Sequence, residues 1–223
     1  MSGFPWARFP GGRSLVLASG SPRRVEMLRR VGIPVVVRAP EGAEPPPRDG
    51  ELPSLYAIRV ASGKAFEVFD PADVALCLAA DTVVVSDRAI LGKPASRGEA
   101  RAMLESLAGR EHCVVTGVAL VDPGAVVGPA HGWTREVTGD GVAVWTAAEV
   151  TRVFFRQLLP EEIEAYLDVG ESMDKAGAYG IQGVGQALVE RVEGCYANVV
   201  GLPLARLIAA LSTLRVDTPR SRR

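Results

Sequence analysis

Residues 14–30 read SLVLASGSPRRVEMLRR, and the prediction of the fold starts from this stretch. Its apolar beginning, residues 15–18, predicts a short buried strand. A turn of small residues over 19–21 follows, and Pro22 stands where a first helical residue belongs, with Ser21 as the N-cap. The sequence therefore predicts a strand, a tight turn and a helix that begins at Pro22.

The start of this helix has the properties of an anion site. A helix N-terminus presents backbone N–H groups and the positive end of the helix dipole, which suit a phosphate. Arg23 and Arg24 lie in the first helical turn, although cations stabilise a helix at its other end. Two arginines in this place are expected if they bind an anion. A capped surface helix with solvated arginines is the alternative interpretation.

The composition indicates a protein with a sizeable core. The chain has 223 residues, of which 48% are hydrophobic, which suffices for one large domain or two small lobes. Its net charge of -1 argues against nonspecific nucleic-acid binding. No apolar run reaches the length of a membrane span, and the N-terminus lacks the apolar segment of a secretory signal.

The cysteines and histidines argue for a cytosolic protein without a zinc site. Cys77, Cys113 and Cys195 are far apart and odd in number, which predicts buried free thiols. His112 and His131, the two histidines, lack the spacing of metal ligands.

Lysine is scarce, since the chain has 22 arginines and only Lys64, Lys93 and Lys175. Arginine thus carries the general surface charge. The remaining lysines are expected where a compact ammonium on a flexible stem is needed. Chance is the alternative, and for Lys64, which lies alone in a predicted helix, a solvated side chain is the ordinary interpretation.

The remaining pattern predicts helices alternating with strands and then an antiparallel hairpin. Strands are expected over 33–37, 74–85, 114–121, 142–157 and 187–192, and helices over 54–69, 96–109, 159–169 and 202–214. Residues 1–13 are expected to form a flexible extension, 122–141 a surface insertion and 215–223 a basic disordered tail. This order favours an α/β fold with a mixed sheet and two lobes around a cleft.

Asp81 is the only charged residue of the predicted strand over 74–85. A carboxylate there costs free energy unless it is paired, bound to a metal or placed at the strand end facing a cleft. A structural aspartate that accepts backbone hydrogen bonds is the alternative. Thr82 beside it is either a ligand contact or a strand former. Lys93, between a glycine and a proline, is expected on a fixed backbone.

Residues 170–185, GESMDKAGAYGIQGVG, form a second unusual stretch with five glycines and Gln182. Such a loop either brings its backbone close to a ligand or is flexible.

These candidates together describe phosphoryl chemistry. The cations suit a polyphosphate, and Asp81 with the loop acid Glu44 suits Mg²⁺ bound through one or two carboxylates. Catalysis would then act by positioning and charge neutralisation. The chain contains no Walker-type phosphate loop, which excludes that class of nucleotide hydrolase.

Several ordered motifs of the chain resemble the Maf family of nucleoside triphosphate pyrophosphatases. They are LASGSPRR at 17–24, ADT at 80–82, GKP at 92–94, TGV at 116–118, DKAGAYGIQG at 174–183 and NVVGLP at 198–203. The resemblance covers residues 15–210 and implies a single domain over 14–214 with an elongated mixed sheet. It further implies a cytoplasmic homodimer that hydrolyses a nucleoside triphosphate to the monophosphate and pyrophosphate with a divalent cation, Mg²⁺ or Mn²⁺.

The resemblance also assigns the chemistry to particular residues. It places the general base and metal ligand at Asp81, the second metal ligand at Glu44, and the phosphate-binding lysines at Lys64 and Lys93. The triphosphate would lie along residues 19–24.

Substrate binding is assigned in the same way. Ser19, Ser21 and Arg24 belong to the turn that would hold the triphosphate. Arg23, Thr82 and Gln182 match the residues of the branch that acts on dTTP and UTP, rather than the branch that acts on 7-methyl-GTP.

Two other functions remain open from the sequence. One is a house-cleaning pyrophosphatase for modified nucleotides, which shares the chemistry but not the substrate. The other is a non-catalytic nucleotide sensor that regulates cell division, although a sensor has no need of an isolated acid such as Asp81. A nucleic-acid-binding role is the weakest, given the charge balance.

Overall fold

The structure, a computed structural model, describes residues 14–72, 75–123 and 131–213. The extension predicted over 1–13 and the tail predicted over 215–223 lie outside the described residues, as does part of the predicted insertion. The helices are α1 (Pro22–Arg30), α2 (Pro53–Val68), α3 (Arg97–Leu107), α4 (Pro160–Val169), α5 (Tyr196–Val200) and α6 (Leu204–Thr213), with short 3₁₀ segments η3 (Ala176–Ala178) and η4 (Gly183–Leu188). The strands are β1 (Leu15–Leu17), β2 (Val35–Val37), β3 (Leu76–Ser86), β4 (Ala89–Leu91), β5 (Glu111–Asp122), β6 (Thr134–Val137), β7 (Ala143–Phe155) and β8 (Val189–Glu193).

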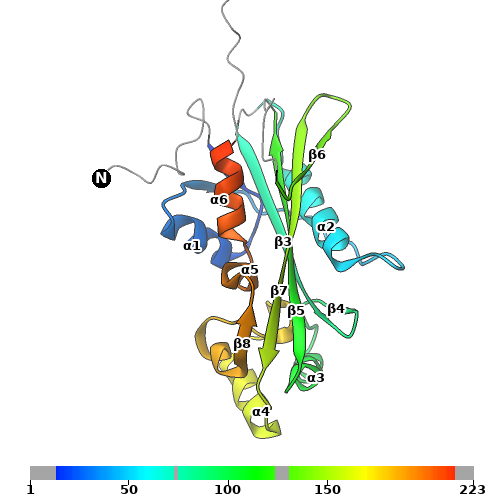
Figure 1. The fold of residues 1–223 in the computed structure, drawn as a ribbon, viewed down its shortest axis with the longest axis vertical. Coiled ribbons are helices and arrows are strands. Elements are labelled where there is room, and N and C mark those ends of the chain that lie inside the picture. Colours follow the sequence, from blue (N-terminus) through cyan, green and yellow to red (C-terminus); the bar gives the residue numbers. More distant parts are fainter. Residues whose placement is uncertain (1–13, 73–74, 124–130, 214–223) are drawn as a thin grey trace, which may run out of the picture.

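The strands form one mixed sheet of eight strands. Its main path runs β2-β1-β3-β5-β7-β6, while β4 pairs with β3 and β8 with β7. β1 is parallel to β2 and β3, and the other pairs are antiparallel. The long strands β3, β5 and β7 run along the length of the molecule (Figure 1). The predicted α/β class with an elongated mixed sheet is confirmed.

Helices cover both faces of this sheet. α2 lies on one face, and α1, α5 and α6 lie on the other (Figure 1). Because successive strand residues point to opposite faces, β1 contributes to both layers. Leu15 and Leu17 pack in the cluster that includes α1, whereas Val16 packs with Ala61 and Ala65 of α2. Residues of β3 likewise belong alternately to the two clusters, so this central strand is covered on both faces.

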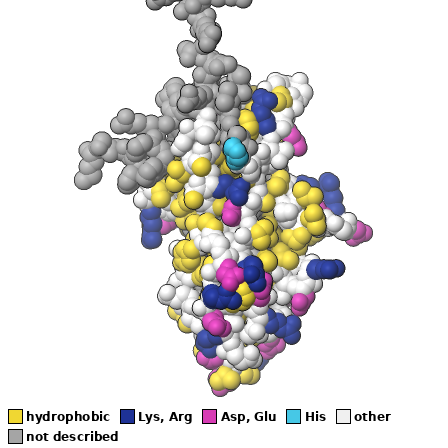
Figure 2. All heavy atoms as spheres, in the orientation of Figure 1, with side chains coloured by type: hydrophobic (Ala, Val, Ile, Leu, Met, Phe, Trp, Pro, Cys, Tyr) yellow, Lys and Arg dark blue, Asp and Glu magenta, His cyan; other side chains and the backbone are white. Residues whose placement is uncertain are grey.

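The surface carries mixed charge on the face shown in Figure 2, where acidic and basic side chains lie interspersed. Ion pairs such as Arg97–Glu164, at 2.6 Å, and Arg101–Glu105, at 3.0 Å, account for part of this mixture. Exposed pairs of this kind contribute little to stability. Among the described helices, none is both long and apolar enough to cross a membrane.

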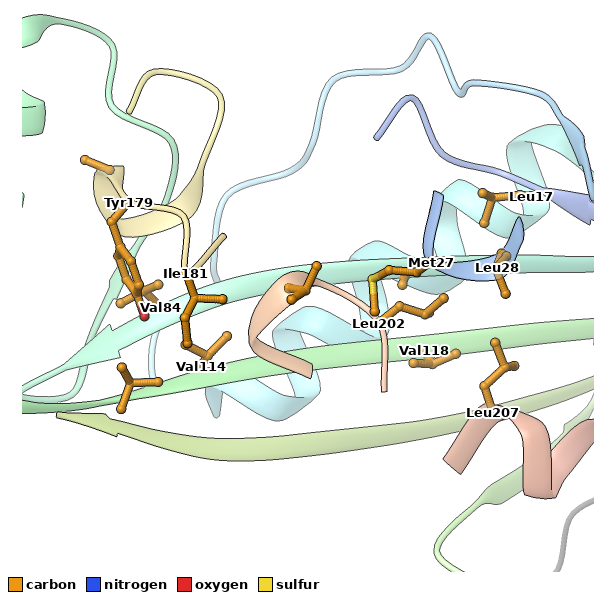
Figure 3. Close-up of a cluster of buried hydrophobic side chains, with 14 of the residues drawn as sticks. Leu17, Met27, Leu28, Val84, Val114, Val118, Tyr179, Ile181, Leu202 and Leu207 are labelled. Carbon is orange, nitrogen blue, oxygen red and sulfur yellow. The ribbon is translucent and has the colours of Figure 1, made fainter. Parts of the chain in front are cut away.

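The larger hydrophobic cluster runs along the long strands. Figure 3 shows it extending from Leu207 of α6, past Leu202 in the turn before α6 and Met27 of α1, to Val114 and Tyr179. The strand–turn–helix unit at the start of the chain thus shares one hydrophobic cluster with the C-terminal helix.

The buried face of α2 differs in part from the predicted one. The sequence pattern predicts an apolar side made of Leu55, Ile58, Ala61, Ala65 and Val68. Ala61 and Ala65 are buried as predicted, but Leu55 is 54% exposed and Ala57 is buried, because α2 packs closely on β5 at Gly117. A Cβ atom added at Gly117 would lie 2.2 Å from the carbonyl carbon of Ala57. The rotation brings Lys64 over the sheet.

Three smaller predictions need correction. The predicted insertion contains β6, which pairs with β7 and therefore belongs to the sheet. Helix α5 was not predicted, since its five residues are too few to show a periodic pattern. Of the three cysteines, only Cys77 is buried, while Cys113 and Cys195 are partly exposed.

Candidate functional site

The residues predicted for the site line one pocket of about 640 Å³. They are Ser19, Ser21, Arg23, Arg24, Glu44, Lys64, Asp81, Thr82, Lys93 and Gln182. They come from the turn before α1, the first turn of α1, the loop after β2, α2, β3, the segment after β4 and the turn between η3 and η4. The fold thus brings together residues that are up to 163 positions apart in the chain, from Ser19 to Gln182.

The N-terminus of α1 forms one wall of the pocket. Ser21 occupies the N-cap position and Pro22 begins the helix, as predicted. The Ser21 hydroxyl makes no capping hydrogen bond, and the first turn holds no acidic residue. The Ser19 hydroxyl instead accepts a hydrogen bond from the Ser21 backbone N–H at 3.2 Å. The positive end of the helix dipole therefore has no acidic side chain of its own helix to offset it, and it can accept an anion.

The two arginines of α1 have different environments. Arg24 is 8% exposed and donates hydrogen bonds to the Gly201 carbonyl oxygen at 2.8 Å, Ser19 Oγ at 3.2 Å and Thr82 Oγ1 at 3.1 Å. Burial lowers the pKa of Arg24 from its usual 12.5, against the opposing effect of the Asp81 charge. All three hydrogen-bond acceptors are uncharged atoms, so Arg24 contributes positive charge to the pocket.

Arg23, by contrast, is partly exposed and forms an ion pair across the pocket. Its Nη1 lies 2.9 Å from Asp174 Oδ2, and Asp174 also pairs with Lys175. Partial burial acts to raise the pKa of Asp174, but hydrogen bonds from Lys175 and Arg23 lower it overall. The alternative of two solvated arginines is therefore wrong for Arg24 and incomplete for Arg23.

Lys64 joins the two acids of the pocket. Its ammonium donates to Asp81 Oδ1 and to Glu44 Oε1, each at 2.7 Å. The Lys64 and Asp81 side chains are 14% and 8% exposed, so this pair is largely shielded from water. Lys93 lies farther out, with its ammonium 3.6 Å from Glu44 Oε1. A solvated Lys64, the ordinary interpretation of its sequence, is excluded by this geometry.

The charge of Glu44 follows from these contacts. Partial burial acts to raise its pKa, but the hydrogen bond and charge of Lys64, with Lys93 and Arg24, lower it overall. Glu44, which lies on the loop after β2, is therefore a carboxylate at neutral pH.

The donor set suits a divalent cation that is held only in part by protein. Within the described residues, no group of three or more histidine, cysteine, aspartate or glutamate side chains could enclose a metal. Mg²⁺ typically uses one or two carboxylates, several waters and substrate phosphates. Asp81 and Glu44, linked through Lys64, match that requirement and would share their oxygens between the cation and the ammonium.

Two pocket residues were missed as site candidates. Asp174 and Lys175 both line the pocket, and both stand in the motif DKAGAYGIQG. The scarcity of lysine was the available signal, because all three lysines of the chain line this pocket. Gly177 permits the close approach of this segment to β3, since its φ is +68° and an added Cβ would lie 2.9 Å from a Val84 methyl group.

The chain is similar in sequence to known proteins over most of its length. The family model described as Maf-like protein matches residues 14–214. A dTTP/UTP pyrophosphatase of Nitratidesulfovibrio vulgaris is 44% identical over 203 residues, which cover 91% of this chain and 89% of that protein. One of Symbiobacterium thermophilum is 46% identical over 200 residues, covering 90% and 93%. One of Geobacter metallireducens is 42% identical over 205 residues, covering 92% and 98%. With a family match over nearly all of its length and relatives at this identity, the chain belongs to the Maf family.

Proposed function

We propose that this protein hydrolyses nucleoside triphosphates, with dTTP and UTP favoured, to the monophosphate and pyrophosphate. The observation that carries the proposal is the buried ion pair of Asp81 and Lys64 in the same pocket as the α1 N-terminus. A carboxylate can accept a proton there, and the surrounding cations can neutralise a polyphosphate. The relatives named dTTP/UTP pyrophosphatase support the reaction and the substrates.

The pocket supports the following roles in the reaction. Asp81 accepts a proton from a water molecule whose oxygen bonds to the α-phosphorus. The bond from the α-phosphorus to the bridging oxygen breaks, and pyrophosphate leaves with its electron pair. Lys64, Lys93 and Arg24 stabilise the charge that develops on the leaving group. Ser19 and the α1 N-terminus orient the triphosphate, because backbone N–H groups at a helix start suit phosphate oxygens.

Selectivity is assigned to three residues that line the pocket. Arg23, Thr82 and Gln182 are proposed to favour the pyrimidine base, while Ser21 belongs to the turn that holds the triphosphate. Arg23 is partly exposed and paired with Asp174, so a substrate can displace this weak pair at small cost.

A divalent cation, Mg²⁺ or Mn²⁺, is part of the proposal, with Asp81 and Glu44 as its protein ligands. Such a cation would supply Lewis-acid stabilisation of the phosphate oxygens when bound. Lys64 holds the carboxylates of Asp81 and Glu44 in the same part of the pocket, since its ammonium donates a hydrogen bond to each of them.

We also infer a cytoplasmic homodimer that does not bind nucleic acid. The family resemblance supports the dimer and the location, and the net charge of -1 argues against a nucleic-acid partner. Residues 14–214, the span of the family match, form one pyrophosphatase domain on this proposal. Sedimentation equilibrium tests the dimer directly.

The experiment is a turnover assay on canonical and modified nucleoside triphosphates with Mg²⁺ or Mn²⁺, in which pyrophosphate and orthophosphate are measured separately. Pyrophosphate released chiefly from dTTP and UTP supports the proposal. Preference for a modified nucleotide would keep the reaction and replace the substrate, and orthophosphate alone would contradict attack at the α-phosphorus. Binding without any turnover would favour the nucleotide sensor.

Asp81→Asn tests the base in the same assay. We expect a loss of about 10²–10⁴ in kcat, the usual contribution of a positioned general base, with the fold retained by circular dichroism. Asp87→Asn is the matched control, because Asp87 is exposed on the β3–β4 turn and asparagine tolerates its positive φ of 47°. An active, folded Asp81→Asn protein would exclude this role for Asp81.

A further inference from the structure

Two threonines on adjacent strands lie side by side behind the pocket. Thr82 of β3 and Thr116 of β5 are cross-strand partners, and their Oγ1 atoms are 2.9 Å apart. Thr82 Oγ1 accepts a hydrogen bond from Arg24 Nη2, and Thr116 Oγ1 lies 3.3 Å from the carbonyl oxygen of Asn198 in α5. Thr116 is fully buried and does not line the pocket. Four segments of the chain thus meet in one line of polar atoms.

The direction of these hydrogen bonds follows from the protons available. A guanidinium can only donate, a carbonyl can only accept, and each threonine hydroxyl has one proton. The contact of Thr116 with the Asn198 carbonyl oxygen, at 3.3 Å, is shorter than that of Thr82 with the Gly201 carbonyl oxygen, at 3.5 Å. We therefore assign the Thr116 proton to Asn198 and the proton between the two threonines to Thr82. The line therefore runs from Arg24 through Thr82 and Thr116 to Asn198, and each member has one defined role.

We infer that Thr116 is a positioning residue that holds Thr82 as the acceptor for Arg24. Without the Thr116 hydroxyl, the acceptor that remains for the Thr82 proton is the Gly201 carbonyl oxygen, at 3.5 Å. That oxygen already accepts from Arg24 Nε at 2.8 Å, and a hydrogen bond at 3.5 Å is weak. Thr82 would then turn or lose a partner, and one of the three contacts that orient Arg24 would change.

The far end of the line is rigid, so Thr116 has a fixed reference. Asn198 is fully buried, and its Nδ2 donates to the Val114 carbonyl oxygen and to Thr151 Oγ1, each at 3.0 Å. Orientation matters for Arg24 because a planar guanidinium binds phosphate oxygens in a fixed geometry. The inference rests on the proposed function, in which Arg24 stabilises charge on the leaving pyrophosphate.

The test compares Thr116→Val, which removes the hydroxyl at similar shape, with Thr116→Ser, which keeps it. For UTP we expect Thr116→Val to lower kcat about tenfold with KM changed less than about twofold. Thr116→Ser should restore most of the loss. Ser86→Ala is the control: Ser86 is a buried hydroxyl residue on the same strand as Thr82 but does not line the pocket, so kcat should stay near the native value.

A double-mutant cycle shows whether Thr116 acts through Thr82. In a Thr82→Val background, adding Thr116→Val should lower kcat by less than about twofold, because the line of hydrogen bonds from Arg24 to Asn198 is already broken at Thr82. Losses that multiply would overturn the inference, as would native kcat in Thr116→Val or an equally impaired Thr116→Ser.

Failure of the proposed function has a different signature, since the native protein would then release no pyrophosphate. In that case the dissociation constant of UTP, measured by calorimetry on the same variants, decides the matter. Weaker binding in Thr116→Val with recovery in Thr116→Ser supports the positioning role. Equal dissociation constants, or no UTP binding by the native protein, overturn it.

Discussion

His112 gives the protein a specific sensitivity to acid. It lies on β5, is 2% exposed, and its Nε2 is 2.7 Å from the hydroxyl of Tyr179, which lines the pocket. The rings of Phe155 and Tyr179 pack edge-on against it, with centroids at 5.0 and 5.4 Å. Among the described residues, its Nδ1 has no hydrogen-bond partner. Burial lowers the pKa of His112 from its usual 6.5 to about 4, and the nearby Glu111 opposes this only in part.

The difference between the pKa of His112 in the unfolded and in the folded protein sets the sign and size of its effect on stability. The unfolded chain takes up a proton on His112 near pH 6.5, whereas the folded protein does so only near pH 4. Stability falls with decreasing pH wherever the unfolded state binds more protons. Between about pH 7 and about pH 5, His112 should therefore lower the free energy of unfolding by about 2 kcal/mol, and by about 3 kcal/mol once the pH is below 4.

The assay is urea unfolding, followed by circular dichroism at both pH values, of the native protein and two variants. His112→Phe removes the titrating group, and its loss of stability between the two pH values should be smaller than the native loss by about 2 kcal/mol. His131→Gln is the control, since His131 is exposed. Carboxylates other than Glu111, whose pKa the nearby His112 helps to lower, titrate alike in all three proteins and cancel in the comparison. An unchanged pH dependence in His112→Phe would refute the argument.

Three further changes have defined outcomes. Gly117→Ala should destabilise the protein by roughly 1–3 kcal/mol in urea unfolding and lower kcat, because its Cβ meets the backbone of Ala57 and displaces α2 with Lys64; native stability would contradict the close packing. Lys64→Met leaves the buried carboxylate of Asp81 without its ammonium partner, so it should lower both the free energy of unfolding and kcat; native values of both would show that the pair is not needed. Cys77, whose pKa burial raises to about 11, should react with iodoacetamide only after denaturation, as mass spectrometry of labelled peptides can show.

The local parts of the site could be predicted from the sequence. The start of α1 at Pro22, the buried strand around Asp81 and the Ser96 cap of α3 depend on neighbouring residues only. At the start of α3, the Ser96 hydroxyl accepts a hydrogen bond from the Glu99 N–H at 3.1 Å, and the Glu99 carboxylate accepts one from the Ala95 N–H. Ordered motifs then sufficed to identify the family, because each motif is a short contiguous stretch.

The sequence by itself thus determined the fold class and the family, and it named ten residues that line one pocket while missing Asp174 and Lys175. Only the tertiary structure decided how they pair. The hydrogen bonds from Lys64 to Asp81 and Glu44 depend on which face of α2 packs on the sheet. Gly117, which is distant in sequence, permits this packing because it has no side chain. The contact of Thr82 with its partner on β5 depends on strand register. Hydrogen bonds form over a range of a few tenths of an ångström, and long-range packing, rather than local preference, sets atomic positions to that tolerance.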